Sequence, residues 1–177
     1  MIEPLLRPRG AVAKTVRRRR DDVGEAHFAI TQFSGWVANA DTKAGLLATA
    51  TIVLGGTLAG QRAEIRASFT PTTWQEWVRA VVMAVTLVAV PAAVLALTAA
   101  LRPRVLDGSR SRYSWPSVAA TPVRDLPRSK RSAADEAWLA AHDLAVIARQ
   151  KFRWLRIALL AWVVGALGLF AWFLLAP

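Results

Sequence analysis

Three long runs without a charged residue dominate this chain of 177 residues. The runs are Ala44–Gln61, Ala80–Leu101 and Ile157–Pro177. A helix of about 20 apolar residues crosses the hydrocarbon core of a bilayer, and the second and third runs reach that length. A soluble domain of this size would have to bury all three runs at once. We therefore predict an all-α membrane protein with three transmembrane helices.

The first run is the shortest and the most polar of the three. Its apolar part, Ala44–Gly60, would rise about 26 Å as a helix, against about 30 Å of hydrocarbon. The alternative is a buried soluble helix, which would leave two spans and place both ends of the chain on one side. We expect no cleaved signal peptide, because the first apolar run begins only near residue 44.

Basic residues are distributed unevenly among the segments outside the runs. Residues 1–43 carry eight Lys and Arg, the segment 62–79 carries three, and 102–156 carries twelve. Lys and Arg are enriched in cytoplasmic segments. We therefore expect a cytoplasmic N-terminus, a cytoplasmic 102–156 and an external 62–79, which is also the arrangement that three spans require.

Local patterns predict the segments around the spans. Thr73 and Glu76 match a capping box at the start of the second helix. Ser132 is expected to cap a helix that continues into the third span, since no strong helix breaker follows it. The expected segments are a disordered basic arm (1–21), an amphipathic cytoplasmic helix (22–43), the first span (44–61), an external loop (62–79), the second span (80–101), a cytoplasmic linker (102–131), a cytoplasmic helix (132–156) and the third span (157–177). The first and last spans thus carry cytoplasmic helical extensions.

Small residues in the spans predict close helix contacts. Gly56 and Gly60 form a pair with three residues between them, and Ala161 and Gly165 form a weaker pair of the same kind. Such pairs let two helix backbones approach closely. They are also common by chance in spans rich in alanine and glycine, so the sequence leaves open whether either pair marks a packing contact.

The residue types present argue against catalysis and metal binding. The chain has no cysteine and two histidines, which excludes thiol chemistry and makes a histidine-rich metal site unexpected. It contains no P-loop, no dinucleotide fingerprint and no hydrolase motif. The runs hold no ionisable group, which argues against proton-coupled transport and intramembrane proteolysis. We expect no enzyme, metal or cofactor, and no nucleic-acid partner, because no recognition module accompanies the basic charge.

Two opposite charges that cannot pair with each other lie at the expected cytoplasmic end of the first span. Asp41 and Lys43 are two residues apart, so on a helix they point about 200° away from one another. The last helix arrives at a similar depth with several cations. We therefore expect an ion pair of Asp41 with Arg153 or Arg156.

Lys43 then lies on one helix face with Trp36 and Asn39. A cation, an amide and an indole on one face could bind a small anionic ring compound through charge, hydrogen bonding and stacking. In the alternative interpretation, Lys43 extends to a lipid phosphate and Trp36 anchors the helix at the interface. The residues alone leave both interpretations open.

The motif Asn39-Ala40-Asp41-Thr42-Lys43-Ala44 runs directly into the first span. With the second span, the basic linker and the run Ala148–Arg156 before the last span, it resembles the membrane-bound effectors of Pycsar antiphage systems over roughly residues 24–175. The resemblance implies a bacterial inner-membrane protein that senses a cyclic pyrimidine mononucleotide made by a cyclase. It also implies that the effector then impairs the membrane and causes abortive infection.

The leading hypothesis is therefore a ligand-gated membrane effector that acts as a homo-oligomer in the lipid bilayer. The alternative is a passive membrane anchor or accessory subunit that docks a soluble partner. The candidate residues are Asp41, Lys43, Lys151 and Arg153 for coupling, Trp36 and Asn39 for ligand contact, and, more weakly, Arg104, Arg112 and Tyr113.

Overall fold

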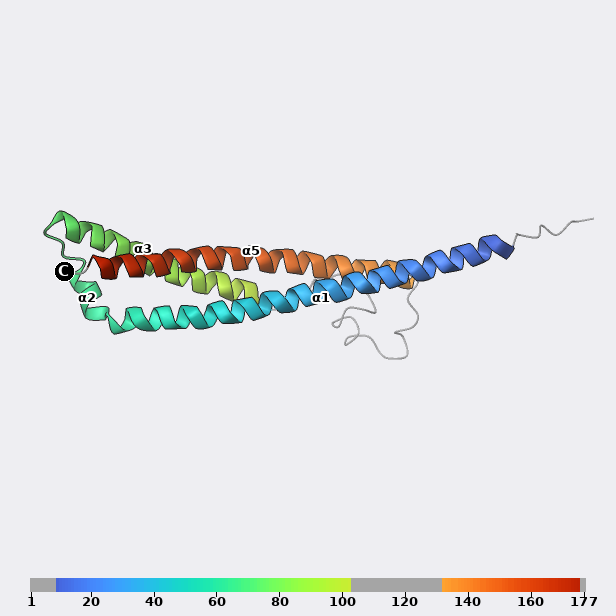
Figure 1. The fold of residues 1–177 in the computed structure, drawn as a ribbon, viewed down its shortest axis with the longest axis horizontal. Helices are drawn as coiled ribbons and strands as arrows, with labels where there is room; N and C mark the ends of the chain where they lie inside the picture. The colour runs from blue at the N-terminus through green and yellow to red at the C-terminus, as the bar shows by residue number, and fades with distance from the viewer. Residues whose placement is uncertain (1–8, 103–131, 176–177) are drawn as a thin grey trace, which may run out of the picture. The chain divides into compact units, whose positions relative to one another are not determined.

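A computed structural model describes residues 9–102 and 132–175 of the chain, with side chains over 22–102 and 132–175. Its helices are α1 (Arg9–Gly60), α2 (Arg62–Ala67), α3 (Trp74–Leu101) and α5 (Ala133–Leu174) (Figure 1). Within these ranges the chain forms no strand. Three of the helices, α1, α3 and α5, are long and apolar enough to cross a membrane. The prediction of an all-α membrane protein with three spans is confirmed.

Two of the expected segments differ from the structure in their extent. Residues 9–21, expected in a disordered arm, belong to α1; alanine and arginine both favour the helix, and a proline directly before a helix is common. The external loop expected over 62–79 contains α2 and the first turns of α3. Most of the expected linker, residues 103–131, lies outside the described residues.

Side-chain caps begin the second and third long helices where the sequence predicts them. The Thr73 hydroxyl accepts a hydrogen bond from the Glu76 N–H, and the Glu76 carboxylate accepts one from the Thr73 N–H at 3.1 Å. At α5, the Ser132 hydroxyl accepts a hydrogen bond from the Asp135 N–H at 3.1 Å. From this cap α5 continues unbroken for 42 residues, which confirms the single long helix.

The chain divides into two compact units, and both α1 and α5 contribute to each. The first consists of Met1–Val37 and Arg104–Ile147, and the second of Ala38–Pro103 and Ala148–Pro177. In the first unit Ala26 and Ala137 are fully buried. The second unit contains the apolar parts of the three long helices, and we call it the membrane bundle.

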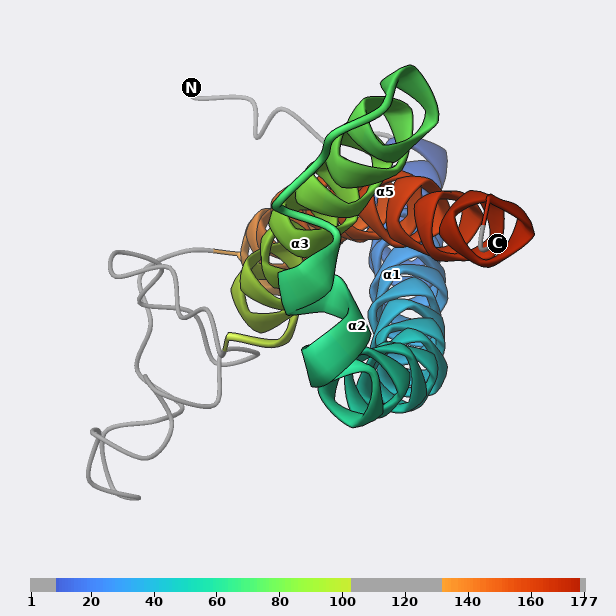
Figure 2. The ribbon, with the colours of Figure 1, turned by 90° about the vertical axis from the view of Figure 1, so that its left-hand side faces the viewer.

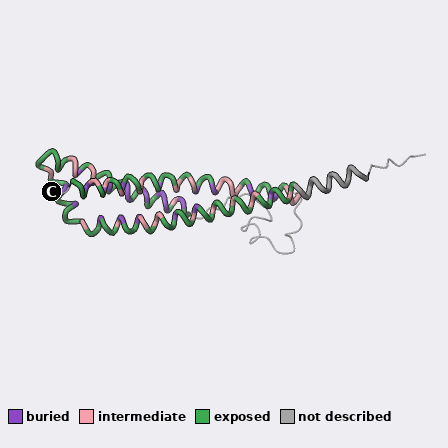
Figure 3. Tube along the Cα trace, viewed as in Figure 1, coloured by how far each residue is buried: buried purple, intermediate pink, exposed green. Residues whose placement is uncertain are grey.

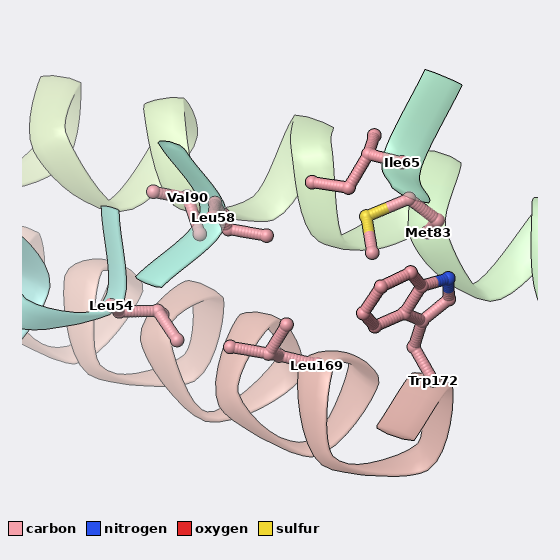
Figure 4. Packing of buried hydrophobic residues seen from close by; sticks show 7 residues of the cluster. All are labelled: Leu54, Leu58, Ile65, Met83, Val90, Leu169 and Trp172. Carbon is pink, nitrogen blue, oxygen red and sulfur yellow. The ribbon is translucent and has the colours of Figure 1, made fainter. Parts of the chain in front are cut away.

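The core of the membrane bundle is built from two apolar clusters. The Ala44 cluster consists of Ala44, Ala96, Leu97 and Ala158. The Trp172 cluster consists of Leu54, Leu58, Ile65, Met83, Val90, Leu169 and Trp172, whose side chains point toward one another (Figure 4). From the first cluster to the second, residue numbers rise along α1 and α5 and fall along α3. In the bundle, α1 and α5 are therefore parallel and α3 is antiparallel to both. Figure 2 views the bundle from the end that holds α2.

Buried residues recur along α1 and α5 within the bundle at spacings of three, four or seven. This repeat is typical of helices that pack at small crossing angles. Buried and exposed residues therefore alternate along each helix (Figure 3), and the exposed side chains include large apolar ones such as Ile52, Val88 and Leu160. In a membrane protein those faces contact lipid. The buried positions are Ala40, Ala44, Thr51, Leu54 and Leu58 on α1, and Ala148, Lys151, Ala158, Gly165, Leu169 and Trp172 on α5.

Glycines mark where α5 approaches α3 closely, and only one of the two glycine pairs in the sequence takes part. A Cβ added at Gly165 would lie 3.1 Å from Cγ2 of Val90, so this pair marks a packing contact. A Cβ at Gly56 or Gly60 would meet nothing within 4 Å, so within the described chain that pair marks none, because this face of α1 turns away from the other helices. Sequence reasoning missed Gly168, where a Cβ would overlap the Thr86 hydroxyl.

Candidate functional site

One ion pair joins α1 to α5 inside the membrane bundle. The Lys151 ammonium, on α5, donates to Oδ1 of Asp41, on α1. The Lys151 side chain is only 10% exposed, whereas that of Asp41 is 42% exposed. A buried ammonium loses its hydration and is stable only when a counter-charge and hydrogen bonds compensate. Asp41 supplies both.

The predicted partner of Asp41 was therefore wrong. We expected Arg153 or Arg156, and both of these side chains are exposed. Lys151 lies on the buried repeat of α5, between Ala148 and Ala158. Arg153 comes two residues later, so it points about 200° away around the helix. Lys151 follows Ala148 by three residues and precedes Ala158 by seven, so it shares their helix face. This spacing is the sequence signal that would have identified Lys151 as the inward-facing cation.

The ion pair lies at the edge of the apolar core. Asp41 comes one turn before Ala44 on α1, and Lys151 comes two turns before Ala158 on α5; Ala44 and Ala158 both belong to the Ala44 cluster. Trp154, between Lys151 and that cluster, packs against it. The pair thus connects two helices shortly before the uncharged part of each begins.

The other described candidate residues are exposed and take no part in the ion pair. Asn39 and Lys43 are exposed on α1 within the bundle, and Arg153 is exposed on α5. Among the described residues, Lys43 forms no ion pair. Trp36 belongs to the first unit, where its half-exposed ring packs edge-on against Phe33 with the centroids 5.3 Å apart. The weaker candidates Arg104, Arg112 and Tyr113 lie outside the described residues.

Sequence reasoning missed a polar cluster around Trp172. The Trp172 indole is completely buried, and its N–H donates to the Ser68 hydroxyl at 3.2 Å. The Arg79 guanidinium lies over its ring, 4.5 Å from the centroid. Trp172 continues the buried repeat of α5 from Gly165 and Leu169, which is the sequence signal that would have placed it inward.

The described side chains offer no metal site. Over residues 22–102 and 132–175, no three His, Asp or Glu side chains come close enough to hold a metal ion. The described site contains one compensated buried charge and exposed cations on two helices.

Comparison with known proteins connects this arrangement to one family. The family model of the Pycsar effector protein domain matches residues 25–177. The match covers both membrane-bundle segments, including Asp41 and Lys151. No curated protein and no solved structure matches the chain.

Proposed function

Since the chain belongs to the Pycsar effector protein family, we propose that it senses a cyclic pyrimidine mononucleotide, cyclic UMP or cyclic CMP, and then impairs the bacterial inner membrane. The expected outcome in an infected cell is abortive infection. The observation that carries the proposal, beside the family match, is the Asp41–Lys151 ion pair, which joins two spans where their uncharged parts begin.

The ion pair offers a physical route from ligand binding to a change in the bundle. A cyclic mononucleotide carries one negative charge on its phosphate, and that charge competes with the Asp41 carboxylate for the Lys151 ammonium. The exposed cations Lys43 and Arg153 attract the anion electrostatically. Asn39 and Trp36 are the proposed contacts for the base, through hydrogen bonding and stacking. Loss of the Asp41–Lys151 contact would loosen α1 from α5.

The bundle is proposed to have a sealed state and a leaky state, in which the membrane is permeable. The ligand can produce the leaky state only by binding it more tightly than the sealed state. A ligand shifts a two-state equilibrium only through its higher affinity for one state, and a shift from 1:99 to 99:1 requires about a 10⁴-fold difference. Two apolar clusters fill the described core of the membrane bundle. We therefore propose that several copies assemble when the membrane leaks. The Lys and Arg distribution supports a cytoplasmic N-terminus, with the ion pair facing the compartment where a cyclase makes its product.

Dye release from vesicles tests this function. We expect vesicles that contain the purified protein to release a trapped dye at least tenfold faster with cyclic UMP or cyclic CMP on both sides. Linear UMP is the control ligand. The double variant Lys43→Gln, Arg153→Gln should need at least tenfold more nucleotide, because it lacks the exposed cations. The matched control Arg62→Gln, Arg66→Gln removes two exposed cations from α2 and should respond as the unchanged protein does.

The proposal fails if neither cyclic nucleotide releases dye from vesicles in which the protein is folded and inserted. A soluble protein that then co-purifies in a fixed ratio would favour the accessory-subunit alternative.

A further inference from the structure

A stacked arginine lies at the end of the membrane bundle that α2 and the start of α3 form. Arg79, in the second turn of α3, places its guanidinium 4.5 Å from the centre of the Trp172 ring. The ring cannot turn easily, because it is completely buried and its N–H is bonded to the Ser68 hydroxyl at 3.2 Å. The position of the guanidinium is therefore set by α5 and by the segment after α2, as well as by its own helix.

No described acidic side chain neutralises this guanidinium. The carboxylate one turn earlier, Glu76, instead accepts hydrogen bonds from the hydroxyl and N–H of Thr72 and from the N–H of Thr73. Among residues 22–102 and 132–175, Arg79 has no ion-pair partner, and its buried Nε has no hydrogen-bond acceptor. Partial burial removes water from the guanidinium, and the unpaired buried Nε costs free energy unless another acceptor replaces that water. An anion from outside the chain would compensate it.

The surrounding residues place Arg79 at the depth of lipid headgroups. Trp74 and Trp77, in the first turn of α3, are both largely exposed, and exposed tryptophans at a span end are typical of the membrane–water interface. The dominant anionic group at that depth is phosphate. A planar guanidinium matches the geometry of phosphate oxygens and can donate two parallel hydrogen bonds to them.

We propose that Arg79 is a binding site for a phosphate group at this end of the bundle, with the guanidinium held in place by Trp172. The phosphate belongs either to a phospholipid headgroup or to free phosphate in solution. The site is independent of the proposed nucleotide sensing, because it lies at the Trp172 cluster and shares no residue with the Asp41–Lys151 ion pair or with the Ala44 cluster beside that pair. It also does not depend on which side of the membrane this end faces.

Thermal unfolding of the full chain in detergent tests the site. The probes are dihexanoyl phosphatidylglycerol, dihexanoylglycerol (which has the same chains without phosphate) and inorganic phosphate, all at matched ionic strength. We expect a saturable rise in Tm with phosphatidylglycerol and none with dihexanoylglycerol. Arg79→Gln should weaken the apparent affinity at least fivefold. Arg79→Lys keeps the charge but loses the planar donor pair. Its apparent affinity should lie between those of Arg79→Gln and the unchanged protein. Arg66→Gln, which removes an exposed arginine of α2, should leave the affinity unchanged.

The outcomes distinguish a lipid source of the phosphate from a free one, and they show when the proposal fails. Saturation by phosphatidylglycerol alone assigns the site to lipid, and saturation by inorganic phosphate at similar concentrations assigns it to free phosphate. An equal response of Arg79→Gln and the unchanged protein, or an equal response to dihexanoylglycerol, overturns the proposal. Because each comparison is a ligand-dependent shift within one variant, a lower basal Tm of Arg79→Gln does not affect the result.

Discussion

Asp41→Asn is expected to lower the free energy of unfolding of the chain by about 1–3 kcal/mol. The change leaves the Lys151 ammonium, only 10% exposed, without a counter-charge. Exposed ion pairs contribute up to about 1 kcal/mol to the free energy of unfolding, whereas breaking a buried pair costs about 3–5 kcal/mol. The expected cost for this pair lies between those limits, because Lys151 is buried but Asp41 is 42% exposed. Denaturant unfolding in mixed micelles, followed by circular dichroism, measures the loss.

The partner variant distinguishes the ion pair from general packing effects. Lys151→Met removes the buried charge and keeps most of the side-chain volume, so it should cost less than Asp41→Asn. The double variant should be about as stable as Lys151→Met alone, because no buried charge remains to be compensated. Glu64→Gln, at an exposed carboxylate of α2, is the control and should be neutral. If Asp41→Asn is neutral as well, the ion pair does not hold α1 to α5.

The same variant carries a consequence for the proposed gating. If the Asp41–Lys151 contact holds the sealed state, vesicles with Asp41→Asn should leak dye before any nucleotide is added. If vesicles with this variant retain the dye and respond to nucleotide as the unchanged protein does, the pair stabilises the fold without coupling to the ligand.

Gly168→Ala is expected to destabilise the chain by about 1–3 kcal/mol, the usual cost of adding a methylene group to a well-packed core. The new methyl group would overlap the Thr86 hydroxyl. Thr86 is fully buried, and its hydroxyl donates to the Val82 carbonyl at 2.9 Å. Either that hydrogen bond is lost or α3 and α5 move apart. The unfolding assay used for Asp41→Asn measures the change.

A matched glycine and a compensating change test the reason for that loss. Gly56→Ala places the same methyl group in open space on α1. It should be neutral or slightly stabilising, since alanine favours the helix more than glycine does. In the Gly168→Ala variant, the additional change Thr86→Ala removes the overlapping hydroxyl and should restore more than half of the lost stability. Equal effects at Gly56 and Gly168 would contradict the close approach of α3 and α5.

Features that depend only on residues close together in the sequence could be predicted. The lengths of the uncharged runs indicated three spans, because helix rise and bilayer thickness are constants. The capping residues Thr73 and Ser132 set helix starts, since a cap needs only a side chain and an N–H three residues later. The resemblance carried by Asn39–Ala44 agrees with the family that the chain belongs to. Two segments departed from expectation: composition alone did not reveal the helix over 9–21, and the expected loop over 62–79 contains α2 and the first turns of α3.

The choice among chemically similar residues depended on the tertiary structure. Lys151 and Arg153 are both cations near the start of the last span, yet a difference of two positions turns a side chain by about 200° around the helix. The packing of α5 against α1 buries Lys151 and leaves Arg153 exposed. Gly56 and Gly168 are both glycines within spans, and only the positions of the helices show that one meets Thr86 and the other meets nothing. Arg79 and Trp172 lie on different helices, so their contact requires the assembled bundle. The sequence alone determined the number of spans and the capped starts of α3 and α5, because these depend on residues close together in the chain. The rotation of each helix about its own axis, and hence every contact between helices, was decided by packing.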